Sequence, residues 1–268
     1  MPELPEVETI KRQPENAIIG RKITKIEVID SKAFIGNPSL VLDKTIIKIS
    51  RRAKILEIIF CDNSALFIHF KMTGRLLCQP QGEFFPERFT RIIFYLDDGS
   101  RLLFDDPRKF GWVKALKDIL AEPQGKAVEP LSSDFTLTNF SKIIQHSKKP
   151  IKLLLMDQNK IGGIGNIYAN EILYAARINP FRLANSLDSS EIKKLYQSVL
   201  KILAKAIKYK GSSGKDEWYR QLNGETGNYQ KYFTVYQRAG QKCLICGNRI
   251  QRKNLGGRGT FYCSKCQK

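Results

Sequence analysis

The chain has 268 residues, which corresponds to about two domains and is long enough to bury a core. Its residues are 42% hydrophobic and 26% charged, a composition that excludes wholesale disorder and fibrous repeats. A formal charge of +19 favours a polyanionic partner such as nucleic acid or an acidic membrane. Residues 201–268 hold 15 Lys and Arg against 3 Asp and Glu, so the last quarter is predicted to bind phosphates.

The sequence indicates a cytoplasmic protein. It has no run of about 18 apolar residues, and its first ten residues lack the basic stretch and apolar core of a signal peptide. In that compartment six cysteines are metal ligands or free thiols rather than a disulfide framework. Cys61 and Cys78 lie in strand-like stretches and are expected to be inert packing thiols.

The first part of the chain is predicted to be rich in β-strands after a short helix over residues 5–11. Alternating or β-branched patterns indicate strands, and Asp97-Asp98-Gly99-Ser100 is typical of a hairpin turn. The expected strands are 22–29, 46–49, 55–60, 65–70, 91–96 and 101–104. Together these patterns favour a sandwich or barrel-like β domain.

From residue 136 the pattern becomes helical. Helices are expected over 138–147, 151–157, 167–176 and 189–209, with Thr138 and Ser189 as N-caps. A loop rich in Gly and Ser and a basic, strand-like tail follow. The resulting plan is a β domain over 1–116, a linker over 117–135, a helical domain over 136–230 and a metal module over 231–268.

Four cysteines near the C-terminus have the spacing of a metal site. Cys243, Cys246, Cys263 and Cys266 form two C-x2-C pairs, and four thiolates are the tetrahedral set that structural zinc prefers. Iron is the competing metal. A closed four-cysteine site leaves no position for catalysis, so one structural zinc ion is predicted. The segment between the pairs carries Arg249, Arg252, Lys253 and Arg258.

A glycine-rich turn separates two of the predicted helices. Gly162-Gly163-Ile164-Gly165-Asn166 can present backbone N–H groups, an amide and a helix N-terminus to a phosphate. The alternative is a tight helix–helix connection with glycine C-caps. Lys152 and Lys160 nearby favour the phosphate interpretation.

The N-terminus offers a nucleophile if Met1 is removed. Pro2 then has a free secondary amine that can attack an electrophilic carbon and form an iminium ion, and the carboxylates of Glu3 and Glu6 can move protons. An ordinary chain end is the alternative interpretation.

Three motifs together resemble the formamidopyrimidine-DNA glycosylases of the Fpg/Nei family of base-excision repair enzymes. They are PELPEVET at residues 2–9, GIGNIYANE at 163–171 and FYCSKCQ at 261–267. The resemblance covers the whole chain in order and spacing. It implies an α+β fold with a leading helix, an N-terminal β-sandwich, a helix-two-turns-helix domain and a four-cysteine zinc finger.

The resemblance implies four catalytic residues. Pro2 would attack C1′ of the damaged nucleotide, and Glu3 would act as the acid that assists ring opening. Lys54 resembles the family lysine that binds phosphate and assists β-elimination, although on its own it would be interpreted as a solvated strand lysine. Arg258 resembles the finger arginine that is linked to δ-elimination.

The resemblance also implies DNA contacts, because a base must be flipped out of the duplex before it is excised. Met72 would enter the vacated space, Arg108 would pair with the orphaned base, and Phe110 would wedge the stack. Without the family, Met72 and Phe110 would be interpreted as core residues. The further DNA-binding residues expected are His69, Lys71, Lys152, Asn166 and Lys215.

The function implied is a bifunctional glycosylase and abasic-site lyase that acts, as a monomer, on oxidised purines in double-stranded DNA. One alternative is a Nei-like enzyme for oxidised pyrimidines, and another is a non-catalytic zinc-ribbon protein that binds damaged DNA. Three positions depart from the family pattern: the loop 211–219, Phe89 where a DNA-contacting His is usual, and Pro14 within the expected first helix.

Overall fold

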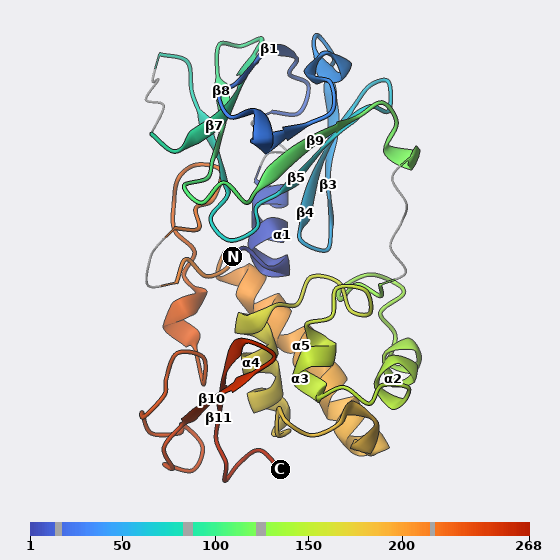
Figure 1. The fold of residues 1–268 in the computed structure, drawn as a ribbon, viewed down its shortest axis with the longest axis vertical. Coiled ribbons are helices and arrows are strands. Elements are labelled where there is room, and N and C mark those ends of the chain that lie inside the picture. Colours follow the sequence, from blue (N-terminus) through green and yellow to red (C-terminus); the bar gives the residue numbers. More distant parts are fainter. Residues whose placement is uncertain (14–17, 83–87, 122–126, 215–217) are drawn as a thin grey trace. The chain divides into compact units, whose positions relative to one another are not determined.

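The computed structural model describes the chain except residues 14–17, 83–87, 122–126 and 215–217. Its internal contacts form two compact units (Figure 1). The first joins Met1–Gln124 with Tyr209–Gln230, and the second joins Gly125–Lys208 with Lys231–Lys268. The domain boundaries expected above stay predictions. Among the described residues, no helix has both the length and the apolarity that a bilayer span requires.

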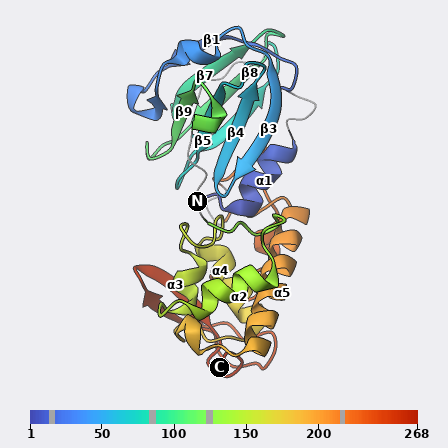
Figure 2. The ribbon, with the colours of Figure 1, turned by 90° about the vertical axis from the view of Figure 1, so that its right-hand side faces the viewer.

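Two β-sheets build the first unit (Figure 2). The four-stranded sheet has the order β1 (Ile23–Val28), β7 (Thr90–Leu96), β8 (Arg101–Asp105) and β6 (Arg75–Gln79). The five-stranded sheet has the order β2 (Phe34–Ile35), β9 (Trp112–Leu116), β5 (Ala65–His69), β4 (Ile55–Phe60) and β3 (Ile46–Arg52). All pairs are antiparallel except β2 with β9. Apolar residues from both sheets form one buried core that includes Ile68, Phe94 and Phe104.

Helix α1 (Leu4–Arg12) packs against β3 and β4. It begins with a proline in its first turn and ends with Lys11 and Arg12 in its last, both favourable for the helix dipole. Every residue from Leu4 to Ile10 is buried. The short 3-10 helices of this part are Ser31–Ala33, Pro38–Val41 and Ile119–Ala121.

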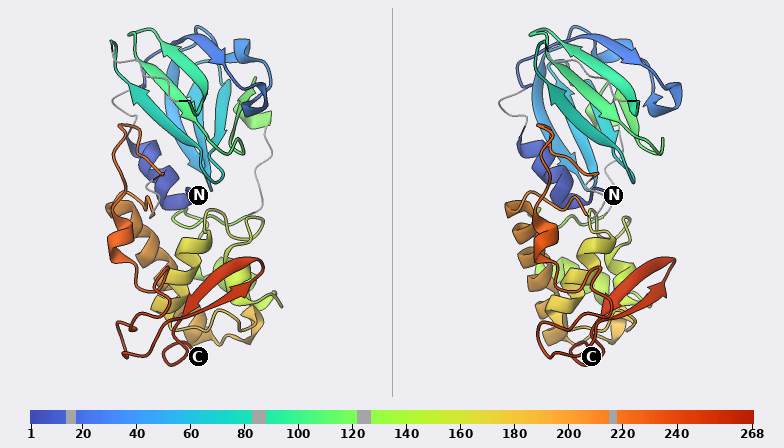
Figure 3. Two further views of the ribbon diagram at one scale, coloured as in Figure 1. Left: turned by 60° about the vertical axis from the view of Figure 1, so that its left-hand side comes forward. Right: turned by 90° about the vertical axis from the view of Figure 1, so that its left-hand side faces the viewer.

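In its described residues, the second unit has four α-helices and one β-hairpin (Figure 3). The helices are α2 (Leu137–Gln145), α3 (Ile151–Leu155), α4 (Asn166–Ala176) and α5 (Ser189–Lys208). The hairpin pairs β10 (Gln251–Leu255) with β11 (Arg258–Tyr262). Helix α4 packs on both α5 and β11, so it joins the helices to the hairpin. Two further 3-10 helices span Ala184–Ser186, in this unit, and Tyr229–Tyr232, where the chain passes from the first unit to the second.

Two predicted helix caps were wrong, although the predicted α+β class is confirmed. The Oγ1 of Thr136, not Thr138, accepts the hydrogen bond from Asn139 N. Before α5 the cap is Asp188, whose Oδ1 accepts from Glu191 N, while Ser189 is already helical. Each true cap lies one or two residues earlier, because Ser and Thr side chains within the first turn also look like caps in a sequence.

A buried carboxylate fixes the loop over residues 234–236, which precedes the hairpin. Glu171 on α4 is 0% exposed and accepts hydrogen bonds from the backbone N–H groups of Thr234, Val235 and Tyr236 at 2.8–3.1 Å. The Thr234 hydroxyl also donates to it. A carboxylate that receives several such donors is strongly held, whereas an uncharged substitute leaves some donors without an acceptor.

We therefore expect Glu171→Gln to destabilise the second unit by about 2–4 kcal/mol, because its amide N–H₂ faces N–H donors in a buried position. Chemical denaturation followed by a probe in this unit measures the effect. Asp134→Asn, at an exposed carboxylate of the same unit, is the control. A loss for Glu171→Gln as small as that of the control would contradict the structural role of this carboxylate.

Candidate active site and nucleic-acid interface

The residues that follow the exposed Met1 are buried. Pro2 is buried, and Glu3 is 2% exposed at the N-cap of α1. The Glu3 backbone N–H donates to Glu6 Oε2 at 2.8 Å, one half of a capping box. Because α1 packs against β3 and β4, these contacts hold the first residues in one position.

Glu6 also holds the segment that follows α5. Its Oε1 accepts from Ser212 N at 2.7 Å, and its carbonyl accepts from the Tyr219 hydroxyl at 3.2 Å. A Cβ on Gly211 would lie 2.8 Å from Glu6 Oε1, and Gly211 has φ +72°, so only glycine fits there. Burial, and secondly the charge of Glu6, raises the pKa of Tyr219 well above its usual value. Glu6 thus joins the chain end to the atypical 211–219 segment.

Lys54 lies in the turn between β3 and β4. The preceding residue, Ala53, has φ +50°, and its carbonyl accepts from Arg51 Nη1 at 3.0 Å. Arg51 Nε donates to Glu8 Oε2 of α1 at 2.9 Å. Burial of Glu8 opposes its ionisation, but the hydrogen bonds from Arg51 and Arg12 lower the pKa of its carboxyl. The solvated-lysine interpretation is wrong, because Lys54 is only 6% exposed.

His69 and Lys71 form one turn with Met72. The Lys71 backbone N–H donates to His69 Nδ1 at 3.0 Å, so the neutral ring carries its proton on Nε2. Burial lowers the pKa of His69 to about 4, and the charges of Lys71 and Lys54 act in the same direction. Lys71 has φ +48°, and Met72 is half-buried.

Asp106 organises the turn that carries Arg108 and Phe110. Asp106 is 0% exposed and accepts from Arg108 N, Phe110 N and Gly111 N at 2.7–3.1 Å. The Arg108 guanidinium lies 4.9 Å from the centre of the Phe110 ring. Phe110 is 54% exposed, so its interpretation as a core residue is wrong. An exposed phenylalanine on a rigid turn can insert between bases.

The glycine turn of the second unit is held by Gln158. Its Oε1 accepts from Gly163 N at 3.0 Å, and its Nε2 donates to Ile164 O at 2.7 Å. Asn166 begins α4 and is partly exposed. The turn therefore presents Asn166 at a helix N-terminus, where an anion is favoured.

Lys152 does not reach solvent. It is 0% exposed, and its Nζ donates to Gly259 O at 3.0 Å and to Thr260 Oγ1 at 2.8 Å. These bonds tie α3 to the hairpin tip, where Gly256 and Gly257 have φ +57° and +72°. The predicted DNA contact of Lys152 is therefore wrong, because its ammonium group is buried and hydrogen-bonded inside the unit.

The exposed tip residue is Arg258, the first residue of β11. It follows a two-residue glycine turn, since Leu255 pairs with Arg258. Arg252 and Lys253 are exposed on β10, so three basic side chains of the hairpin are available to phosphates. The predicted contact Lys215 and the departure at Pro14 lie outside the described residues.

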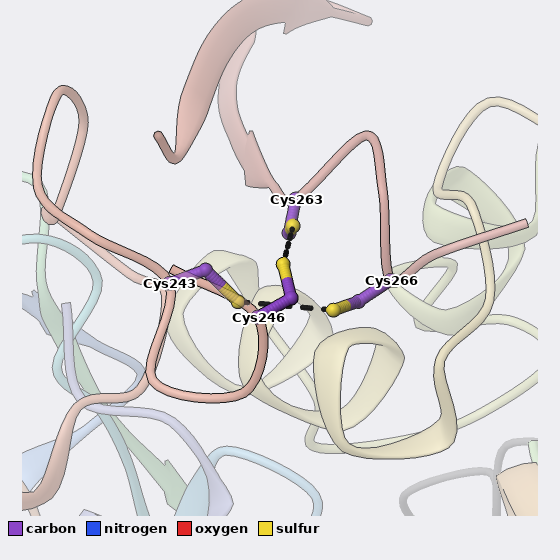
Figure 4. A group of neighbouring side chains, drawn as sticks. All are labelled: Cys243, Cys246, Cys263 and Cys266. Carbon is purple, nitrogen blue, oxygen red and sulfur yellow. Dashed lines mark hydrogen bonds between the residues drawn. The ribbon is translucent and has the colours of Figure 1, made fainter. Parts of the chain in front are cut away.

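The four predicted metal ligands converge (Figure 4). Their sulfur atoms all lie within 4.8 Å of one another, with Cys243 and Cys266 3.8 Å apart and Cys246 and Cys263 3.5 Å apart. Tetrahedral zinc with Zn–S bonds of about 2.3 Å places its sulfurs about 3.8 Å apart, so the site fits one zinc ion. The Tyr174 hydroxyl lies 3.0 Å from Cys243 Sγ, which orients that ligand.

Several residues that support this site were not predicted from the sequence. Asn170 Oδ1 accepts from Phe261 N at 2.7 Å and so joins α4 to β11. Asn166, Asn170 and Tyr174 recur every four residues on one face of α4, and this polar spacing was the available signal. No comparable pattern marked Gln158 or Trp218.

Family models match almost the whole chain. The formamidopyrimidine-DNA glycosylase N-terminal domain matches residues 1–113, its H2TH domain matches 127–217, and a zinc finger found in FPG and IleRS matches 240–268. A formamidopyrimidine-DNA glycosylase of Pelotomaculum thermopropionicum is 42% identical over 100% of this chain and 99% of its own. One of Rickettsia bellii is 38% identical over 100% of both chains.

Solved structures agree with this assignment. The MutM (FPG) protein of Thermus thermophilus superimposes with a TM-score of 0.90 at 35% identity, covering 99% of this chain and 98% of its own. A Lactococcus lactis FPG mutant in complex with Fapy-dG-containing DNA gives a TM-score of 0.89 at 35% identity, covering 100% of both. The chain therefore belongs to the formamidopyrimidine-DNA glycosylase family.

Proposed function

We propose that the chain removes oxidised purines from double-stranded DNA through Pro2 and then cleaves the strand at the abasic site. The DNA glycosylase class follows from family membership, and abasic-site lyase activity is typical of the family. The observation that carries the residue assignment is the buried, fixed chain end, in which Pro2 and Glu3 lie at the start of α1.

The chemistry begins once Met1 has been removed. The Pro2 amine attacks C1′ of the damaged nucleotide, the bond from C1′ to the base breaks, and the base leaves with a proton. Glu3 protonates O4′, the sugar ring opens, and a C1′ iminium forms. Loss of a C2′ proton then expels the 3′ phosphate. A second elimination expels the 5′ phosphate, and water releases the amine.

Basic side chains assist the eliminations and bind the DNA backbone. Lys54 and Lys71 lie near His69, where both charges act on its ring, so this edge of the first unit attracts phosphate. Neutral His69 donates from Nε2 to a phosphate oxygen. In the second unit Asn166 and Arg258 contact the backbone around the lesion.

Flipping the damaged base leaves a space in the duplex that must be filled. Met72 enters this space, Arg108 pairs with the orphaned base, and Phe110 wedges the neighbouring step. Support comes from the exposure of Phe110 and from Asp106, which fixes the turn of Arg108 and Phe110.

The combination of Met72, Arg108 and Phe110 favours an oxidised purine as the lesion. A second candidate is an oxidised pyrimidine, since the wild-type Lactococcus lactis Fpg (MutM) has been solved with oxidised-pyrimidine-containing DNA. That protein has also been solved with abasic-site-containing DNA. Excision rates on 8-oxoguanine, formamidopyrimidine and thymine glycol duplexes separate the candidates.

The proposed setting is the bacterial cytoplasm, in contact with chromosomal DNA. It rests on the bacterial sources of the relatives and on the polyanionic substrate. The enzyme is proposed to act as a monomer, and one structural zinc ion is held by the four cysteines.

Borohydride trapping on abasic-site DNA tests the nucleophile. We expect wild-type protein without Met1 to form a covalent adduct. Pro2→Gly should trap at least about 10-fold more slowly, and Glu3→Gln should lower turnover by about 10²–10⁴-fold. Pro5→Gly, one helical turn away, should still trap. If Pro2→Gly behaves like wild type, Pro2 is not the nucleophile.

His69 should not titrate near neutral pH. Its folded pKa is about 4, below the ordinary value near 6.5, so between pH 6.5 and pH 4 the unfolded chain binds more protons at this residue than the folded chain. Stability should therefore fall as the pH falls through this window. NMR of the imidazole resonance, assigned with His69→Gln, checks this. A His69 midpoint at or above pH 6 would be incompatible with the buried, neutral ring.

Zinc removal should weaken DNA binding by at least about 10-fold while leaving the first unit folded, because the metal fixes only the segment that carries Arg258. Chelation followed by fluorescence anisotropy with duplex DNA measures the binding. The β-sheet signal in circular dichroism reports whether the first unit stays folded. Collapse of the whole fold on chelation would contradict this local role.

A further inference from the structure

Trp218 lies in the atypical 211–219 segment, and its side chain packs against residues in and next to the β-sheets within the first unit. Its indole Nε1–H donates to the carbonyl of Thr73, directly after Met72. Its ring lies 4.5 Å from the guanidinium of Arg75 and edge-on to Phe89, with ring centres 5.8 Å apart. Trp218, within the atypical loop, thus contacts Phe89, a second departure from the family pattern.

The guanidinium that contacts the Trp218 ring is itself held in place by a buried carboxylate. Arg75 is 7% exposed, and its Nε and Nη2 both lie 3.0 Å from Oδ2 of Asp105, which is 0% exposed. Asp105 also accepts from the Thr90 hydroxyl at 2.7 Å. A guanidinium held in this way offers a fixed surface for a cation–π contact.

Thr73 connects Trp218 to a second turn. Its hydroxyl donates to Asp106 Oδ1, and Asp106 in turn receives the backbone N–H groups of Arg108, Phe110 and Gly111. A continuous hydrogen-bonded path therefore runs from Trp218 through Thr73 and Asp106 to Phe110. It lies entirely within the first compact unit.

The turn that carries Met72 is closed at its base. Gly74 N donates to Phe70 O at 2.8 Å, and a Cβ on Gly74 would lie 2.6 Å from that oxygen. The Trp218 bond adds a restraint on the Thr73 carbonyl. A turn restrained before DNA arrives loses less conformational freedom when its side chain enters the duplex.

We propose that Trp218 is a positioning residue that pre-orders the turns of Met72 and Phe110 for filling the space left by the extruded base. This inference rests on the proposed function, in which Met72 and Phe110 act on the duplex. Trp218 acts through Thr73 and makes no contact with the reacting atoms.

The test compares Trp218→Phe with wild type. Phenylalanine keeps a ring over Arg75 and beside Phe89 but removes the N–H donor. We expect single-turnover excision of 8-oxoguanine from duplex DNA to slow about 3- to 10-fold, the usual effect of one hydrogen bond. The fluorescence change of 2-aminopurine next to the lesion, which reports unstacking, should slow in parallel.

A single-stranded abasic oligonucleotide separates positioning from chemistry, because it has no stacked duplex space to fill. Trp218→Phe should be trapped by borohydride on this substrate at the wild-type rate. Tyr95→Phe, which removes a hydrogen bond on the exposed side of β7, is the matched control and should match wild type on both substrates.

A double variant tests the path. If Trp218 acts through Thr73, Trp218→Phe combined with Thr73→Val should slow duplex excision less than the product of the two single effects. Wild-type duplex excision in Trp218→Phe, or equal slowing on single-stranded DNA, would overturn the inference. Absence of trapping in the wild type would instead overturn the proposed function.

Discussion

The structure depends on one constraint: the chain end that carries the proposed nucleophile is buried and held. Chain termini are ordinarily frayed and exposed, whereas Pro2 and Glu3 are buried here. Glu6 provides this order, since its two carboxylate oxygens bind Glu3 N and Ser212 N. One side chain therefore links the chain end to the segment that departs most from the family pattern.

Buried carboxylates with backbone N–H partners recur at the other functional turns. Asp106 fixes the turn of Arg108 and Phe110, and Glu171 fixes the segment before the zinc finger. In a chain with a formal charge of +19, these acidic groups are occupied inside the protein. We propose that the basic side chains of the turns and the hairpin face DNA.

Much of the fold followed from local patterns, and the rest depended on long-range partners. The strands with β-branched alternation and the cysteine spacing were predictable, whereas β9 was missed although Trp112–Leu116 alternates in burial. From the residues alone, Pro2 and Glu3 fitted either a nucleophilic site or an ordinary chain end, and only the family resemblance favoured the nucleophilic site. The burial of Lys152 was not predicted because its partner Thr260 lies 108 residues away in the sequence. The role of Trp218 was missed for the same reason, since its partner Thr73 lies 145 residues away.

The central claim is that the N-terminal nitrogen of Pro2 bonds to C1′ of the lesion nucleotide. Peptide mass spectrometry of the borohydride-reduced protein–DNA adduct locates that bond most directly. The account predicts that the DNA fragment maps to the N-terminal peptide that begins at Pro2, with no Met1. An adduct at Lys54 or another lysine, or an adduct on a chain that retains Met1, would contradict it.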